Sequence, residues 1–138
     1  MKSYYRYILL FLFLSISSYT FTPGILFTLP SESSENVVNI IHAFLYYGFL
    51  ILSSFIWYFI TGGGPDGGMA LILLLVMIIP IVSIFFYIFT PDVLFQLPPN
   101  GSKEIVAGTH SLLFGIGSQI GMKLIFDLIR FIQSERYR

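Results

Sequence analysis

Two histidines are the side chains of this sequence best placed for chemistry inside a membrane. His42 and His110 are its only histidines, and each stands about two turns into a long apolar segment. Ionisable groups in such segments are candidates for proton relays or metal ligands. The structural interpretation is a hydrogen bond across a helix interface, or to the turn of the same half of the chain. We favour the structural role, because no carboxylate accompanies the histidines in the apolar zone. Asn39, one turn before His42, is matched by Ala107 before His110, which argues against a symmetric relay.

Further polar residues and several small ones share the last apolar segment. Gln119 and Lys123 are four residues apart, so they lie on one face of a helix and are candidates for lining a pore. The sequence Gly117-x-x-x-Gly121, with Gly115 just before it, is typical of helices that approach closely in lipid. We prefer the packing interpretation, with the second helix of the chain or another copy of the protein as the partner.

The rest of the sequence excludes several classes of function. It holds no Ser/His/Asp set, no paired catalytic carboxylates, no nucleotide fingerprint and no cysteine. Seven basic residues balance seven acidic ones, so no basic field for nucleic acid exists. We therefore predict a protein that is not an enzyme, has no cofactor or metal, and binds no nucleic acid.

The histidines belong to an internal repeat with a register of 68 residues, which aligns His42 with His110. Residues 21–30 read FTPGILFTLP, and residues 89–98 read FTPDVLFQLP. Each copy predicts a turn bounded by prolines, because proline ends a helix and restricts the residue before it. The structural turn residues are Thr22, Pro23, Gly24, Pro30, Thr90, Pro91 and Pro98. Asp92 replaces Gly24 in the second copy, which leaves the shared geometry of the two turns open.

Composition indicates that the repeat lies in a lipid bilayer. The chain has 138 residues, of which 56% are hydrophobic and 10% charged, and a soluble domain of that size rarely has so little polar surface. We predict an all-α membrane protein with four transmembrane helices, built as two tandem helical hairpin repeats. The first hairpin is residues 1–60, a Gly-rich linker is 61–68, the second hairpin is 69–126, and a polar C-terminal tail is 127–138.

Three details of these segments carry expectations of their own. Residues 7–14, preceded by Lys2 and Arg6, also fit a removable secretory signal. They occupy the place in the first repeat that residues 69–89 occupy in the second, so we predict a helix that is retained. We expect Pro80 to kink the third helix and Ser34 to cap the second.

The basic residues predict an orientation. Four spans place both termini and the linker on one side of the membrane and both turns on the other. The first side holds Lys2, Arg6, Lys123, Arg130, Arg136 and Arg138, whereas the turn side holds Lys103 alone. The termini should therefore face the cytosol or its equivalent. The sequon Asn100-Gly101-Ser102 lies close to the bilayer on the other side, and we expect it to stay unglycosylated.

The two turns, each followed by a helix with a histidine about a dozen residues on, resemble small hydrophobic proteins of large double-stranded DNA viruses of eukaryotes. The resemblance covers about 25 residues in each half, with Thr22-Pro23-Gly24 matching the start of the viral pattern. It implies a component of the membrane beneath an icosahedral capsid, or a minor capsid-associated membrane protein.

These observations support one leading hypothesis and two alternatives. The leading hypothesis is a structural protein of a virion membrane, whose partners are the lipid bilayer and either copies of itself or capsid proteins. The first alternative is a small oligomeric channel or transporter that uses His42, His110, Gln119 and Lys123. The second is an accessory subunit of a larger membrane complex.

Overall fold

Helices make up all the regular structure in the part of the chain that the computed structural model describes, residues 2–30, 32–62 and 67–136. Helix α1 is Lys2–Phe21 and helix α2 is Glu35–Thr61. A third continuous helical segment, called the third rod below, consists of α3 (Gly67–Leu73), the π-helical turn η1 (Leu74–Ile78) and α4 (Ile79–Phe89). Helix α5 is Lys103–Arg136. The all-α fold predicted from the sequence is therefore correct.

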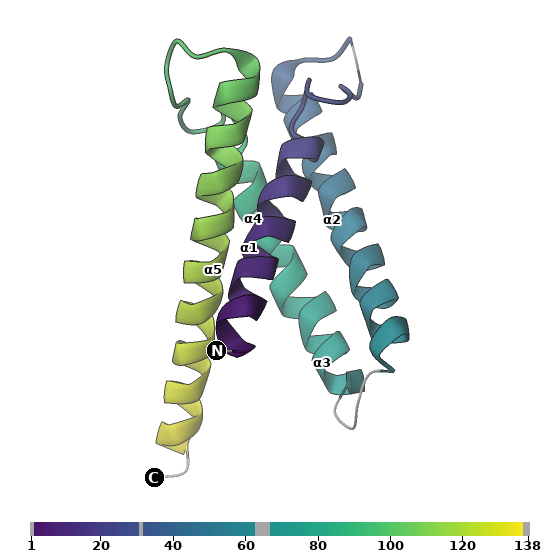
Figure 1. Cartoon of the computed structure of the whole chain (residues 1–138), viewed down its shortest axis with the longest axis vertical. Coiled ribbons are helices and arrows are strands. Elements are labelled where there is room, and N and C mark those ends of the chain that lie inside the picture. The colour runs from purple at the N-terminus through teal and green to yellow at the C-terminus, as the bar shows by residue number, and fades with distance from the viewer. Residues whose placement is uncertain (1, 31, 63–66, 137–138) are drawn as a thin grey trace.

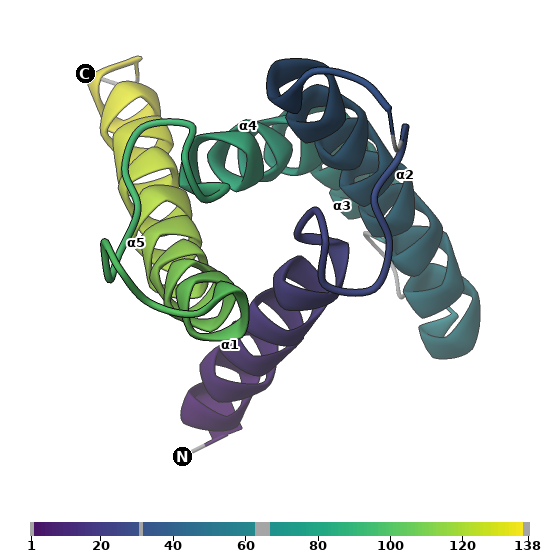
Figure 2. The ribbon, with the colours of Figure 1, turned by 90° about the horizontal axis from the view of Figure 1, so that it is seen from above.

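The two repeats run in the same direction and pair crosswise. Both turns lie at the upper end of the bundle in Figure 1, and the C-terminal end of α5 lies at the lower end. Helix α1 packs mainly against α5, and α2 packs mainly against α4. These are equivalent contacts, because α1 corresponds to α4 and α2 to α5 in the repeat. Figure 2 shows the resulting order around the bundle, α1, α5, α4 and α2.

Aromatic rings mark the pseudo-twofold axis that relates the repeats. Tyr46 of α2 and Phe114 of α5 are equivalent residues, and their ring centroids lie 5.7 Å apart. Residues that contact their own equivalents must lie beside the axis. Phe86 of α4 stacks on Tyr46 at 4.4 Å and meets Phe114 edge to face at 5.9 Å. All three rings are buried, so the core of the bundle lies on its axis.

Three helices are long and apolar enough to cross a membrane, namely residues Glu35–Thr61, Leu71–Phe89 and Lys103–Arg136. These lengths and compositions are consistent with a multi-pass membrane protein. Helix α1 was expected to be a fourth span but does not belong to this set. Its apolar stretch ends at Leu14 and is flanked by Arg6 on one side and by Ser15, Ser17 and Ser18 on the other.

Proline and glycine set the remaining boundaries. Pro80 has no N–H and its ring crowds the carbonyl four residues earlier, and the helix widens into η1 immediately before it. Gly62 ends α2 with a left-handed φ of 73°. Residues 63–66 of the predicted linker lie outside the described residues. Helix α5 continues unbroken to Arg136 and so includes the first residues of the tail predicted at 127–138.

Ser34 occupies the predicted N-cap position of α2, but its side chain does not make the hydrogen bond that usually accompanies this position. The Ser34 backbone is extended there. Its carbonyl accepts from the Val38 N–H at 3.1 Å. At the equivalent position of the second repeat, the Ser102 hydroxyl accepts from the Ile105 N–H at 3.4 Å.

Candidate functional site: two locked turns and the cavity between them

The first turn leaves α1 through a left-handed glycine. Gly24 has φ 88°, a conformation that only glycine adopts without steric cost. Its N–H donates to the Phe27 carbonyl at 2.9 Å, which closes the turn. The Thr22 hydroxyl donates to the Ser18 carbonyl at 2.8 Å and so bonds the last turn of α1. The Leu29–Pro30 peptide bond is cis.

The second turn has the same geometry, which answers the question that Asp92 raised. Asp92 has φ 72°, the only positive value at a non-glycine position among the described residues. Its N–H donates to the Phe95 carbonyl at 3.1 Å, and the Thr90 hydroxyl donates to the Phe86 carbonyl at 2.8 Å. The Leu97–Pro98 bond is cis as well. Aspartate tolerates the left-handed region better than most residues, so the replacement keeps the turn.

Each histidine holds the turn of its own repeat through two backbone hydrogen bonds. Nε2 of His42 accepts from the Leu29 N–H at 3.1 Å, and its Nδ1 lies 2.8 Å from the Phe21 carbonyl oxygen. His110 repeats this arrangement with Leu97 at 3.0 Å and Phe89 at 2.8 Å. One ring therefore ties the end of one helix to the far side of the turn.

The partners define the protonation state of both rings. A backbone N–H can only donate and a carbonyl can only accept, so Nδ1 carries the proton and Nε2 is the acceptor. This is the neutral imidazole. Phe27 stacks on His42 with centroids 4.8 Å apart, and Phe95 stacks on His110 at 4.7 Å. Both histidines are almost fully buried, with exposed fractions of 0% and 2%.

This bonding leaves the histidines poorly suited to the relay or metal roles. Both ring nitrogens of each residue are engaged with the backbone. Among the described residues, no group of three or more His, Cys, Asp or Glu side chains is arranged to hold a metal ion. Of the two structural roles considered for the histidines, the geometry matches hydrogen bonding to the turn of the same repeat.

The other two polar candidates lie apart from the histidines. The Gln119 side-chain amide donates to the Tyr7 carbonyl of α1 at 2.6 Å. Lys123 is exposed one turn further along α5. On the axis between the turns and the opposite end of the bundle stand the rings of Tyr46, Phe86 and Phe114. The four residues proposed for a channel therefore line no common path within one chain.

The small residues of α5 lie against α1 and α4 within the chain. A Cβ on Gly115 would collide with Ser15 and Phe11 of α1. On Gly117 and Gly121 it would press on Phe89 and Phe85 of the third rod. Within the chain these residues meet α1 and α4 rather than α2, one of the two partners considered, because the two hairpins dock crosswise.

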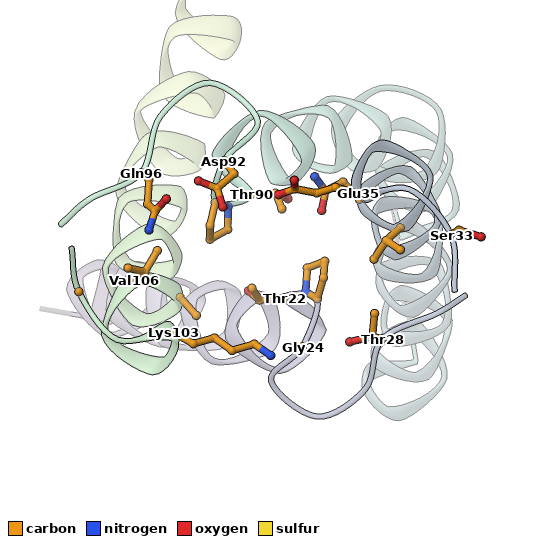
Figure 3. Close-up of a pocket in the computed structure, with 16 residues that line it drawn as sticks. Thr22, Gly24, Thr28, Ser33, Glu35, Thr90, Asp92, Gln96, Lys103 and Val106 are labelled. Atoms are coloured by element: carbon orange, nitrogen blue, oxygen red, sulfur yellow. The ribbon is translucent and has the colours of Figure 1, made fainter. Parts of the chain in front are cut away.

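A cavity of about 560 Å³ lies between the two turns. Figure 3 shows it from the turn end, with side chains from both repeats pointing inward. Its lining is made entirely of residues that are equivalent in the repeat, so the pseudo-twofold axis passes through it. The pairs are Thr22 and Thr90, Pro23 and Pro91, Gly24 and Asp92, Thr28 and Gln96, Ser33 and Gly101, Glu35 and Lys103, Val38 and Val106, and Asn39 and Ala107.

The cavity is the part of the site that the sequence analysis missed. Turn residues Thr22, Pro23, Gly24, Thr90 and Pro91 were singled out, but only as determinants of backbone geometry. The available signal was the pair Glu35 and Lys103, which places opposite charges at equivalent positions. This charge difference becomes informative only once the crosswise docking of the hairpins is known, because the docking brings Glu35 and Lys103 to the same cavity.

Comparison of the chain with known protein families, curated proteins and solved structures gives no match. The functional argument therefore depends on the turns, the cavity and the membrane helices themselves.

Proposed function

We propose that this protein is a structural, non-enzymatic membrane protein that spans the bilayer four times and ties it to an adjoining protein layer. The observation that carries the proposal is the presence of two turns with the same hydrogen bonds, presented at the same end of the bundle (Figure 1). A protein that has to display a fixed surface benefits from rigid turns. The resemblance of these turns to viral membrane proteins suggests that the layer is the shell of a virion.

The dimensions of α1 support a fourth span. Twenty helical residues rise about 30 Å, roughly the thickness of a hydrocarbon core. The helix also packs along α5, which is itself long and apolar enough to cross. Two of the serines near its end have partners, because the Ser17 hydroxyl bonds Tyr46 and the Ser18 hydroxyl donates to the Ser15 carbonyl, whereas the buried Ser15 hydroxyl has none. Such internal partners satisfy polar groups in lipid.

The charge distribution supports an orientation with both turns on the exterior or lumenal side. Basic residues are concentrated at the two ends of the chain, and Lys103 alone lies at the turn end. The positive-inside rule then places the termini in the cytosol or its equivalent.

Cysteine labelling tests both the span count and the orientation. The natural chain has no cysteine, so single-cysteine variants need no background change. Tyr4→Cys, Asn100→Cys and Ser134→Cys lie at exposed positions. If the chain spans four times, a membrane-impermeant maleimide added to sealed vesicles of one orientation should label Asn100→Cys and neither of the other variants. In vesicles of the opposite orientation it should label Tyr4→Cys and Ser134→Cys but not Asn100→Cys. Labelling of Tyr4→Cys from the same side as Asn100→Cys would show that α1 does not cross.

The end of α5 is proposed as a second contact, in addition to the turns, with a protein layer on the terminal side. Its last turns expose both apolar and charged side chains, among them Leu128, Phe131 and Ile132. Deleting the residues after Ile132 should leave membrane insertion intact and reduce recovery of partner proteins. Quantitative mass spectrometry of the tagged full chain and the truncated chain, isolated from the same membrane, measures this. Equal recovery of partners by both chains argues against a role for the tail.

Copy number tests the structural role itself. A structural component occurs in fixed proportion to the main shell protein of its particle or membrane assembly. Quantitative mass spectrometry of purified particles should give that ratio. A few copies per particle would favour an accessory or transport role. The geometry offers little to a single-chain channel, because aromatic rings occupy the axis.

A further inference from the structure

We propose that the axial cavity is a binding site for a small amino-phosphate zwitterion, the chemistry of phosphoethanolamine. The cavity, of about 560 Å³, falls within the range of about 300–1,000 Å³ that is common for ligand sites. It lies at the ends of helices that are able to cross a membrane, and therefore at the level of lipid headgroups. This binding role goes beyond the structural function proposed above.

The charges of the lining are separated across the cavity. Figure 3 shows Asp92 and Glu35 along one wall and Lys103 on the facing wall. The Lys103 side chain extends over Gly24 of the other repeat, where a Cβ would collide with it. Within the described part of the chain, Lys103 forms no ion pair with either carboxylate. A ligand with an ammonium group at one end and a phosphate at the other matches this separation.

A buried amide provides an independent indication of a ligand. Asn39 lines the cavity and is only 4% exposed. Its side-chain amide makes no hydrogen bond to any described residue and is not among the fully buried polar atoms without a partner, so it opens onto the cavity, where a ligand can bond it. The Asn39 amide offers both donors and an acceptor, so it suits either end of a zwitterion. Ala107, the equivalent residue of the second repeat, has no hydrogen-bonding group in its side chain.

The lining of the cavity differs between the two repeats, so its two sides carry different side chains. Three lining pairs are identical, namely Thr22 and Thr90, Pro23 and Pro91, and Val38 and Val106. The five that differ are Gly24 and Asp92, Thr28 and Gln96, Ser33 and Gly101, Glu35 and Lys103, and Asn39 and Ala107. A symmetric cavity would place like charges opposite each other. The actual lining is complementary to a ligand with two unlike ends.

Binding of free phosphoethanolamine to the full chain tests the proposal. The protein is purified in a maltoside detergent, which carries no zwitterionic group, and titrated in a calorimeter. We expect saturable binding that weakens about tenfold or more in Lys103→Gln and in Glu35→Gln, because each removes a charge-assisted bond. Glu104→Gln is the matched control, since Glu104 neighbours Lys103 on α5 but does not line the cavity. Its affinity should be unchanged.

A second arm distinguishes a lipid headgroup from a free ligand. Phosphatidylethanolamine is added to the detergent-solubilised protein, and retained lipid is counted by native mass spectrometry, with phosphatidylglycerol as the comparison. Retention of phosphatidylethanolamine that falls in Lys103→Gln, without binding of free phosphoethanolamine, assigns the site to lipid. Binding of the free compound with the same dependence assigns it to a soluble ligand.

The proposal fails if neither compound binds, or if Lys103→Gln and Glu35→Gln bind as the unchanged chain does. Thermal unfolding of each variant checks that the fold persists. Lys103 and Glu35 are exposed and hold no turn, so both variants should unfold at the temperature of the natural chain.

Discussion

The two turns and the cavity between them have diverged to very different degrees. The turns share a left-handed φ at positions 24 and 92, their closing hydrogen bonds and both histidine bonds, although the residues at these two positions differ. The cavity that these turns help to line has lost its symmetry in five of its eight lining pairs, two of which, Gly24 with Asp92 and Thr28 with Gln96, lie within the turns. The duplicated chain has thus kept the contacts that hold the backbone and changed the side chains that face the axis.

This contrast separates groups that determine the fold from groups that are available for recognition. The histidines are buried and fully bonded, so their replacement should cost stability. The charged cavity side chains of Glu35 and Lys103 are exposed and hold neither turn, so their replacement should cost binding alone. The predictions below test that separation, and they are ordered by the size of the expected effect.

Removal of either histidine should give the largest loss. His110→Ala leaves the Leu97 N–H and the Phe89 carbonyl without partners and opens a space beside Phe95. We expect the free energy of unfolding to fall by about 3 to 5 kcal/mol. Titration with sodium dodecyl sulfate in mixed micelles, followed by circular dichroism, measures it.

The same measurement on His42→Ala tests the equivalence of the two turns. His42 makes the same two bonds and the same ring contact, so its loss should match that of His110 within about 1 kcal/mol. His110→Gln, which can still reach one of the two backbone groups, should lose less than His110→Ala. A small effect at one histidine and a large effect at the other would show that the turns are not equivalent.

The sequence predicted the turns better than it predicted their assembly. Proline placement and the aligned histidines lie within single hairpins, where neighbours in sequence are neighbours in space. The pairing of α1 with α5 could not be predicted, because helices in lipid are apolar on every side and their pattern does not identify the packed face. The small residues of α5 were found, but their contacts with α1 and α4 were not predicted for that reason. The cavity was missed because it exists only between docked repeats.

Glycine replacement on α5 should have the next largest effect and tests the crosswise pairing. Gly115→Leu would place a side chain against Ser15 and Phe11 of α1, and it should cost about 1 to 3 kcal/mol through overpacking. Gly108→Ala on the same helix is the control, since its Cβ would meet nothing within 4 Å. That control should be neutral or slightly stabilising, because alanine favours helix. Equal losses at both positions would contradict the packing of α5 on α1.

The left-handed positions of the turns should respond in opposite directions. Gly24→Ala forces a Cβ into φ 88° and against Lys103, and it should cost about 1 to 2 kcal/mol. Asp92→Gly removes a Cβ from φ 72° and should leave stability unchanged or raise it by a few tenths of a kcal/mol. Unfolding titrations of both variants measure this. A loss in Asp92→Gly would mean that the carboxylate itself holds the second turn.

The smallest effect should come from the cavity charges. Glu35→Gln and Lys103→Gln remove groups that make no ion pair within the described part of the chain, so each should change the free energy of unfolding by less than about 0.5 kcal/mol. The double variant should add nothing further, because the two side chains point from opposite walls of the cavity (Figure 3). Unfolding in the absence of any zwitterionic lipid is the required measurement. If either single change destabilises the chain as much as His110→Ala does, the cavity belongs to the scaffold, and the separation between fold and recognition is lost.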